Sequence, residues 1–65
     1  MDEKLRRIHA AIGYLDIPKK ALARNLGISR SLFSMYLRGD LNMPEGIEEK
    51  LRERLIREFA EVAAQ

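Results

Sequence analysis

Apolar residues recur along this chain at the three- and four-residue spacing of amphipathic helices, and no stretch alternates with the two-residue period of a strand. The first such pattern predicts a helix over residues 3–15, with one apolar face. That face comprises Leu5, Ile8, Ile12 and Leu15. Asp2 stands directly before the helix, where its carboxylate can accept a hydrogen bond from a free backbone amide.

Two short helices are predicted next, over residues 18–26 and 29–38. Pro18 suits the first turn of the earlier one, because a helix start leaves its amide unpaired in any case. Gly27 can adopt the positive φ that ends this helix. Ser29 is placed to cap the following helix with its hydroxyl group. The predicted buried faces comprise Leu22, Ala23, Leu26, Phe33, Tyr36 and Leu37.

A long last helix is predicted over residues 44–64, where Pro44 begins it and glutamates in the first turns suit the positive end of the helix dipole. Its main apolar stripe comprises Ile47, Leu51, Leu55, Phe59 and Val62. Residues 1–65 are therefore expected to form a single all-α domain. It has four compactly packed helices, or five if the loop over residues 40–43 holds a short extra turn.

Composition narrows the class of protein. A chain of 65 residues forms one small domain, which buries only ~60% of the surface that its unfolded form exposes. There is no cysteine, which excludes disulfides, thiolate zinc sites and a cysteine nucleophile. The one histidine, His9, cannot build a multi-histidine metal site and is expected to be a structural or surface residue. We therefore expect no enzyme activity, cofactor, metal or small-molecule substrate.

The same sequence argues against membrane insertion and secretion. No apolar run approaches the ~20 residues that span a bilayer. The first residues, Met-Asp-Glu-Lys, do not begin a signal peptide, which needs an apolar core followed by small residues. We therefore expect a cytoplasmic protein with no membrane partner.

The net charge of +2 hides a marked asymmetry. Residues 17–39 contain five basic residues and no acidic one, whereas residues 45–65 contain four basic and six acidic ones. Because fields add over a surface, the basic segment attracts polyanions even though the whole chain is nearly neutral. Charge alone leaves two interpretations open, a nucleic-acid-binding surface or a solvated basic face.

The two short predicted helices have the features that a helix-turn-helix needs. Ala23 is small where two steeply crossing helices approach each other. Gly27 permits a tight turn without steric cost, and Ile28 fills the angle between the helices. The outward face of the second helix would then present Arg30, Ser31, Ser34, Met35 and Arg38. Such a helix fits the major groove of DNA, where arginine can pair with guanine and serine with several bases.

The segment from Lys19 to Gly39 resembles the helix-turn-helix of the phage lambda repressor and Cro superfamily. The matching residues are Leu22-Ala23, Leu26-Gly27-Ile28-Ser29-Arg30-Ser31, Phe33-Ser34, Tyr36-Leu37 and Gly39. The resemblance implies a lambda-repressor-like fold that binds double-stranded DNA sequence-specifically, as a repressor-like transcriptional regulator does.

What the resemblance implies for single residues follows from the matched positions. Arg30, Ser31 and Ser34 would read bases. Lys19 and Lys20 would lie near phosphates. Ser29 and Arg38 would lie nearer the DNA backbone. Apart from the resemblance, Met35 on the outward face is placed to touch a thymine methyl group.

Two alternatives remain open. The long last helix is similar, more weakly, to the end of the N-terminal DNA-binding domain of phage Mu-type transposition ATPases, although the chain has no phosphate-binding Gly-Lys-Ser/Thr loop. A helical protein-interaction module is the alternative from another class. The last helix carries a second apolar strip that either packs on the first helix or pairs two copies into a homodimer. It comprises Ile56, Ala60 and Ala63.

Overall fold

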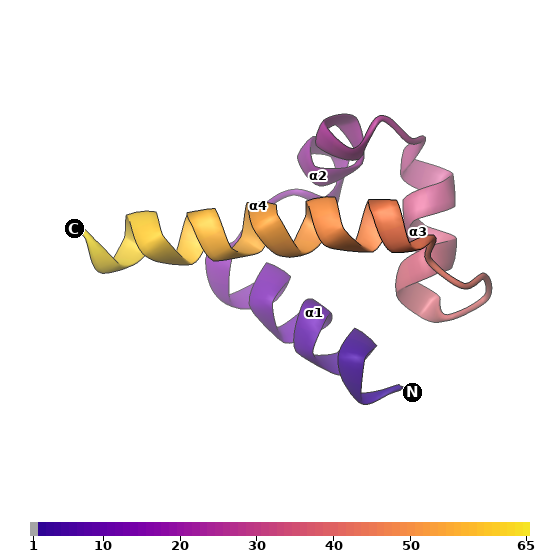
Figure 1. The fold of residues 1–65 in the computed structure, drawn as a ribbon, viewed down its shortest axis with the longest axis horizontal. Helices are drawn as coiled ribbons and strands as arrows, with labels where there is room; N and C mark the ends of the chain where they lie inside the picture. The colour runs from indigo at the N-terminus through magenta and orange to yellow at the C-terminus, as the bar shows by residue number, and fades with distance from the viewer. Residues whose placement is uncertain (1) are drawn as a thin grey trace.

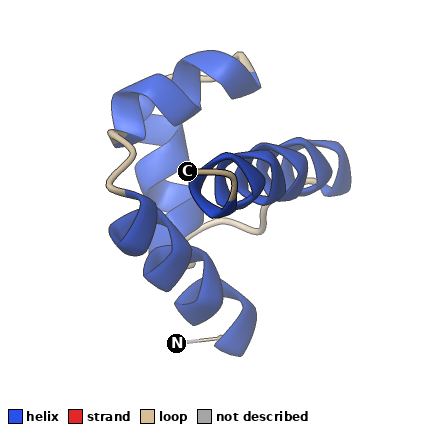
Figure 2. Cartoon of the chain, turned by 90° about the vertical axis from the view of Figure 1, so that its left-hand side faces the viewer, coloured by secondary structure: helices blue, strands red, loops and turns tan. Residues whose placement is uncertain are grey.

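The computed structural model describes residues 2–65 and contains four helices in that range (Figure 1). They are α1 (Glu3–Leu15), α2 (Lys19–Leu26), α3 (Arg30–Arg38) and α4 (Glu45–Ala63). Every described element is a helix or a loop (Figure 2), so the all-α prediction is confirmed. Residues 40–43 contain no helical turn, and the four-helix alternative is therefore the correct one.

The predicted helix bounds are correct to within one residue. α1 begins and ends as predicted, whereas α2, α3 and α4 each begin one residue later. The residues Pro18, Ser29 and Pro44 stand just outside these helices, because their ψ angles of 134°, 155° and 147° are extended rather than helical. Each is therefore a cap, the half-in residue that precedes the first helical one.

The first three helices end in the same way, with one residue in the left-handed conformation. These residues are Asp16, Gly27 and Gly39, with φ angles of 55°, 72° and 82°. In each case the left-handed residue and its successor donate backbone hydrogen bonds back into the helix, which pairs carbonyl groups that the helix leaves free. Asp16 is the only residue other than glycine with a positive φ among those described.

The core lies where α1, α2, α3 and α4 face one another, and the predicted buried faces of α2 and α3 are confirmed. Phe33 and Leu22 are fully buried, with 0% of their surface exposed. Burying an apolar side chain of this size contributes about 1.5–3 kcal/mol. The remaining buried residues are Ile12, Ala23, Leu26, Tyr36, Leu37, Leu51 and Leu55.

The apolar stripe of α4 is only partly buried. Leu51 and Leu55 belong to the core, but Phe59 and Val62 are 41% and 45% exposed. The reason is length: α4 has 19 residues, and its second half extends past the other helices (Figure 1). The second strip does not pack on α1 either, because Ile56 is 61% exposed and Ala60 is exposed as well. Ala63 is exposed with them.

Two polar contacts join segments far apart in the sequence. The ammonium group of Lys4 on α1 lies 2.8 Å from the carboxylate of Glu48 on α4. A hydrogen bond to Glu48 and its negative charge raise the pKa of Lys4 above its ordinary value. The ring nitrogen Nε2 of His9 on α1 lies 2.7 Å from the backbone carbonyl oxygen of Leu37, near the end of α3, and forms a hydrogen bond with it. Because a carbonyl only accepts, Nε2 must carry the hydrogen. His9 therefore has a structural role.

Within residues 2–65, no helix combines the length and the apolar character that crossing a membrane would require. This agrees with the distribution of charge, because charged side chains occur in every helix. α4, the longest helix, carries both acidic and basic residues along its length.

Candidate nucleic-acid interface

The connection between α2 and α3 is a tight turn built from three residues. Gly27 takes the left-handed conformation, and its amide donates to the carbonyl of Arg24 over 3.1 Å. The amide of Ile28 donates to the carbonyl of Ala23 over 3.1 Å. The Ile28 side chain packs against the core cluster, which holds the two helices at their angle. The turn therefore has the local structure that the sequence predicted.

Ser29 begins α3 in the predicted manner. Its hydroxyl oxygen accepts a hydrogen bond of 3.0 Å from the backbone amide of Leu32. A serine cap of this kind stabilises a helix by about 1 kcal/mol. The hydroxyl hydrogen is not used in this bond, so it can still be donated to an acceptor outside the protein. Ser29 can thus cap α3 and contact a phosphate oxygen at the same time.

The outward face of α3 gathers the predicted base-reading residues into one place. A shallow open depression of about 500 Å³ lies on this face and is lined only by α3 residues. They are Arg30, Ser31, Ser34, Met35 and Arg38, which are the residues that the sequence placed there. Phe33, Tyr36 and Leu37 are buried on the opposite side of the same helix. Because α3 is anchored on one side, its polar side is free to face a ligand.

The side chains of this depression differ in accessibility. Arg30, Ser31 and Arg38 are exposed, whereas Ser34 and Met35 are half-buried. The half-buried pair forms the floor, and the arginines stand at the ends of the helix. An arrangement with long cations at the ends and small or apolar groups between them suits a polyanion that carries hydrogen-bonding groups along its length.

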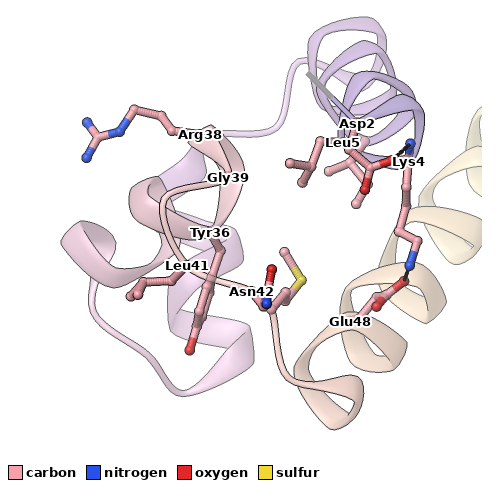
Figure 3. A pocket seen from close by; sticks show the side chains of 11 residues that line it. Asp2, Lys4, Leu5, Tyr36, Arg38, Gly39, Leu41, Asn42 and Glu48 are labelled. Carbon is pink, nitrogen blue, oxygen red and sulfur yellow. Dashed lines mark hydrogen bonds and ion pairs between the residues drawn. The ribbon is translucent and has the colours of Figure 1, made fainter.

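Arg38 has an acidic neighbour that sequence reasoning left out. Its Nε donates to the carboxylate of Asp40 over 3.0 Å. Asp40 lies just beyond the acid-free segment, at the start of the loop. Both side chains are more than half exposed, at 64% and 55%, so this ion pair is weak and is screened by salt. The guanidinium group extends outward from the end of α3 (Figure 3), and a phosphate group can compete for it.

Lys19 and Lys20 lie on α2, outside the depression on α3. They are the first residues of that helix, both are exposed, and its first turn contains no acid. Pro18, the cap, has no side-chain group that could accept a hydrogen bond from the free amides. Two ammonium groups therefore add to the positive end of the helix dipole. This end of α2 is the expected place for phosphate contacts.

Arg24 is a further candidate that sequence reasoning missed. It is exposed and lies four residues after Lys20, which puts both cations on the outward face of α2. The signal that could have found it is this spacing, set against a buried face of Leu22, Ala23 and Leu26. With Arg24 included, the exposed faces of both helices of the motif carry basic side chains.

A second hollow lies between the start of α1, the end of α3 and the loop that follows it (Figure 3). It has a volume of about 480 Å³ and is lined by both apolar and charged groups. Its charged residues include Lys4 and Glu48, which form an ion pair with each other and so are not free to bind a ligand in the hollow. No group of three metal-ligating side chains gathers in this hollow or elsewhere in the described part of the chain.

Comparisons of the chain with protein-family models, with curated proteins and with solved structures give no match. The candidate interface is therefore characterised by its own geometry. It consists of a tight helical turn, a half-anchored helix with a polar outer face, and cations on both helices. The hollow beside α1 shares only Arg38 with the outer face of α3.

Proposed function

We propose that this chain binds double-stranded DNA in a sequence-dependent manner, with α3 in the major groove, and acts as a repressor-like transcriptional regulator. The observation that carries the proposal is the outward face of α3, where two arginines, two serines and a methionine line one depression opposite the buried face. Residues 17–39 contain no acid that would repel a phosphate.

Contacts to phosphates and contacts to bases have different roles in this proposal. Phosphate contacts supply most of the affinity and fix the orientation, while side chains that reach base edges select the sequence. Lys19, Lys20 and Ser29 are suited to phosphates because they stand at helix starts. Arg30 is suited to a base edge, because the start of the recognition helix is the end that usually contacts bases. Regulation then follows from what the occupied site blocks.

The first test measures how strongly salt weakens binding. A fluorescently labelled duplex of mixed sequence is titrated with the protein at several salt concentrations, and anisotropy gives the affinity. Because each neutralised phosphate contributes a slope of about −0.9, we expect log affinity to fall against log salt with a slope of roughly −3 to −5 for one copy. Absence of binding at low salt would contradict the proposal and favour a protein-interaction module.

The second test asks whether α3 reads sequence. A preferred site is first selected from a random pool, and Arg30→Ala is then compared with the unchanged protein on that site and on mixed sequence. We expect a loss of about 1–3 kcal/mol on the selected site and almost none on mixed sequence. Arg57→Ala, an equal change of charge at an exposed position on α4, is the matched control and should leave both affinities nearly unchanged. Equal losses on both duplexes would show that Arg30 contacts phosphate only.

A further inference from the structure

The second half of α4 carries an exposed apolar surface that the DNA proposal does not use. Beyond Leu55 no residue of α4 is buried. Ile56, Phe59 and Val62 are 61%, 41% and 45% exposed. The ring of Tyr14, at the end of α1, stacks on that of Phe59 with centroids 5.7 Å apart, yet Tyr14 is itself 71% exposed. Large apolar side chains gathered in this way are typical of an interaction surface.

Four residues of this surface form a continuous strip along one side of α4. They are Ile56, Phe59, Ala60 and Ala63, and we name them the α4 strip. Their spacing of three, one and three residues keeps them on one helical face. All four are exposed, and none carries a charge. The strip therefore offers an uncharged face, along which a second helix can lie.

We infer that the α4 strip is the interface of a homodimer in which the α4 helices of two copies pack antiparallel. Reversing the helix about a point between Phe59 and Ala60 brings Phe59 of one copy opposite Ala60 of the other. The same reversal brings Ile56 opposite Ala63. Each large side chain thus meets a small one, which is how facing helices interdigitate. The strip is complementary to itself, as a two-fold contact requires.

The exposed apolar area of this surface agrees with the area that a dimer interface buries. Fully exposed aromatic side chains offer about 150–250 Å² each, so the α4 strip together with the adjoining ring of Tyr14 offers roughly 400 Å² per copy. Apolar atoms supply about 55–65% of a protein interface, which corresponds to roughly 600–700 Å² buried per copy. A standard interface buries about 800 Å² per partner. The surface therefore fits a dimer that dissociates on dilution.

The strip also continues into an open groove between α1 and α4, which widens the contact. Ile8, Leu55, Ile56 and Phe59 supply its apolar lining, and the charged residues at its rim include both signs. Two of these charges are already paired across one turn, Arg52 with Glu48 at 3.3 Å. A rim that carries both signs does not repel a second copy of itself. The charges beside the interface therefore do not oppose the pairing of two copies.

The test is sedimentation of the free protein, without DNA, between about 10 and 300 μM. We expect the mass to rise from the 7.5 kDa of one copy toward twice that value. Ile56→Glu should keep the protein at the mass of one copy, because it places a carboxylate opposite the partner's Ala63. Since Ile56 is 61% exposed, this change leaves the core intact, which circular dichroism checks. Lys50→Glu, at an exposed position outside the strip, is the matched control and should still dimerise.

A mixing experiment tests the antiparallel pairing itself. Ala63→Lys alone should also weaken the dimer, but an equal mixture of Ile56→Glu and Ala63→Lys should form a mixed dimer. In that dimer the introduced carboxylate of one copy meets the introduced ammonium group of the other, and the second pair of positions keeps its original residues. A mixture that stays at the mass of one copy would overturn the pairing. An unchanged protein that stays monomeric at 300 μM would overturn the inference, as would a dimer that Ile56→Glu leaves intact. None of these outcomes depends on whether the chain binds DNA.

Discussion

Single residues determine where the helices end, and Gly27 is the clearest case. Its φ of 72° is a conformation that side chains bearing a Cβ rarely adopt. A Cβ placed on Gly27 would meet no heavy atom within 4 Å. Any cost of adding a methyl group here therefore comes from the backbone conformation and not from crowding.

We expect Gly27→Ala to lower the free energy of unfolding by about 1–2 kcal/mol, because alanine is strained in the left-handed conformation. Urea denaturation followed by circular dichroism measures the change. Gly13→Ala is the matched control: it adds the same methyl group inside α1, where the Cβ also meets nothing within 4 Å and φ is not positive. It should raise stability by about 0.5–1 kcal/mol. Equal effects of the two substitutions would contradict the left-handed turn.

At the scale of elements, α4 has two halves with different energetics. Its first half contributes Leu51, which is 1% exposed, and Leu55 to the core. Its second half contributes side chains such as Val62, which remains 45% exposed. The same apolar spacing continues through both halves, so only the neighbouring helices distinguish them.

We expect Leu51→Ala to cost about 2–5 kcal/mol, because it removes a fully buried side chain and leaves a cavity. In a domain this small, such a loss is a large fraction of the total free energy of unfolding. Val62→Ala should cost less than ~0.5 kcal/mol in dilute solution, where the chain is monomeric. Denaturant melts at low micromolar concentration compare the two, and similar losses would place Val62 in the core.

The sequence predicted the helices well because their start and stop signals are local. Pro18, Ser29 and Pro44 precede helices, and Gly27 ends one, for reasons that need only neighbouring residues. Periodicity likewise predicted which face of α3 is buried and hence which side chains line its outer face. How far α4 extends beyond the core could not be predicted in this way, since a periodic stripe is the same whether or not a neighbouring helix covers it.

Contacts between distant segments were also beyond sequence reasoning. The Lys4–Glu48 ion pair and the hydrogen bond between His9 and Leu37 each join residues whose approach depends on how the helices cross. Arg38 and Asp40 are close in sequence, but they pair because Gly39 reverses the chain between them. These contacts involve charged or polar groups on exposed or half-buried faces, where apolar periodicity carries no information.

At the scale of the whole molecule, the two proposed surfaces lie apart. The molecule is 36 Å along its longest dimension, and α3 and the end of α4 stand toward opposite ends of it (Figure 1). A copy that pairs through the α4 strip therefore keeps the outer face of α3 free. If α3 contacts DNA as proposed, a dimer presents two copies of it, and binding to two half-sites is how helix-turn-helix dimers commonly gain specificity.

Dimerisation should also make stability depend on concentration. Because a partner binds only the folded chain, mass action raises the melting temperature as protein concentration increases. We expect a rise in Tm for the unchanged protein between about 10 and 300 μM, and a constant Tm for Ile56→Glu. Differential scanning calorimetry measures both series. A Tm that does not vary for the unchanged protein would contradict the dimer independently of sedimentation.

The tight turn between α2 and α3 has a consequence for the order in which the chain folds. Three residues separate these helices, so bringing them together costs less loop-closure entropy than bringing α4 back onto α1 or α2. Contacts between neighbours in sequence also speed folding. We therefore expect the α2–α3 unit to be the nucleus of the transition state, with native-like interactions around Ala23 and Ile28 before α4 docks. The part of the molecule that we propose reads DNA would then form first during folding and be the last to lose its shape on unfolding.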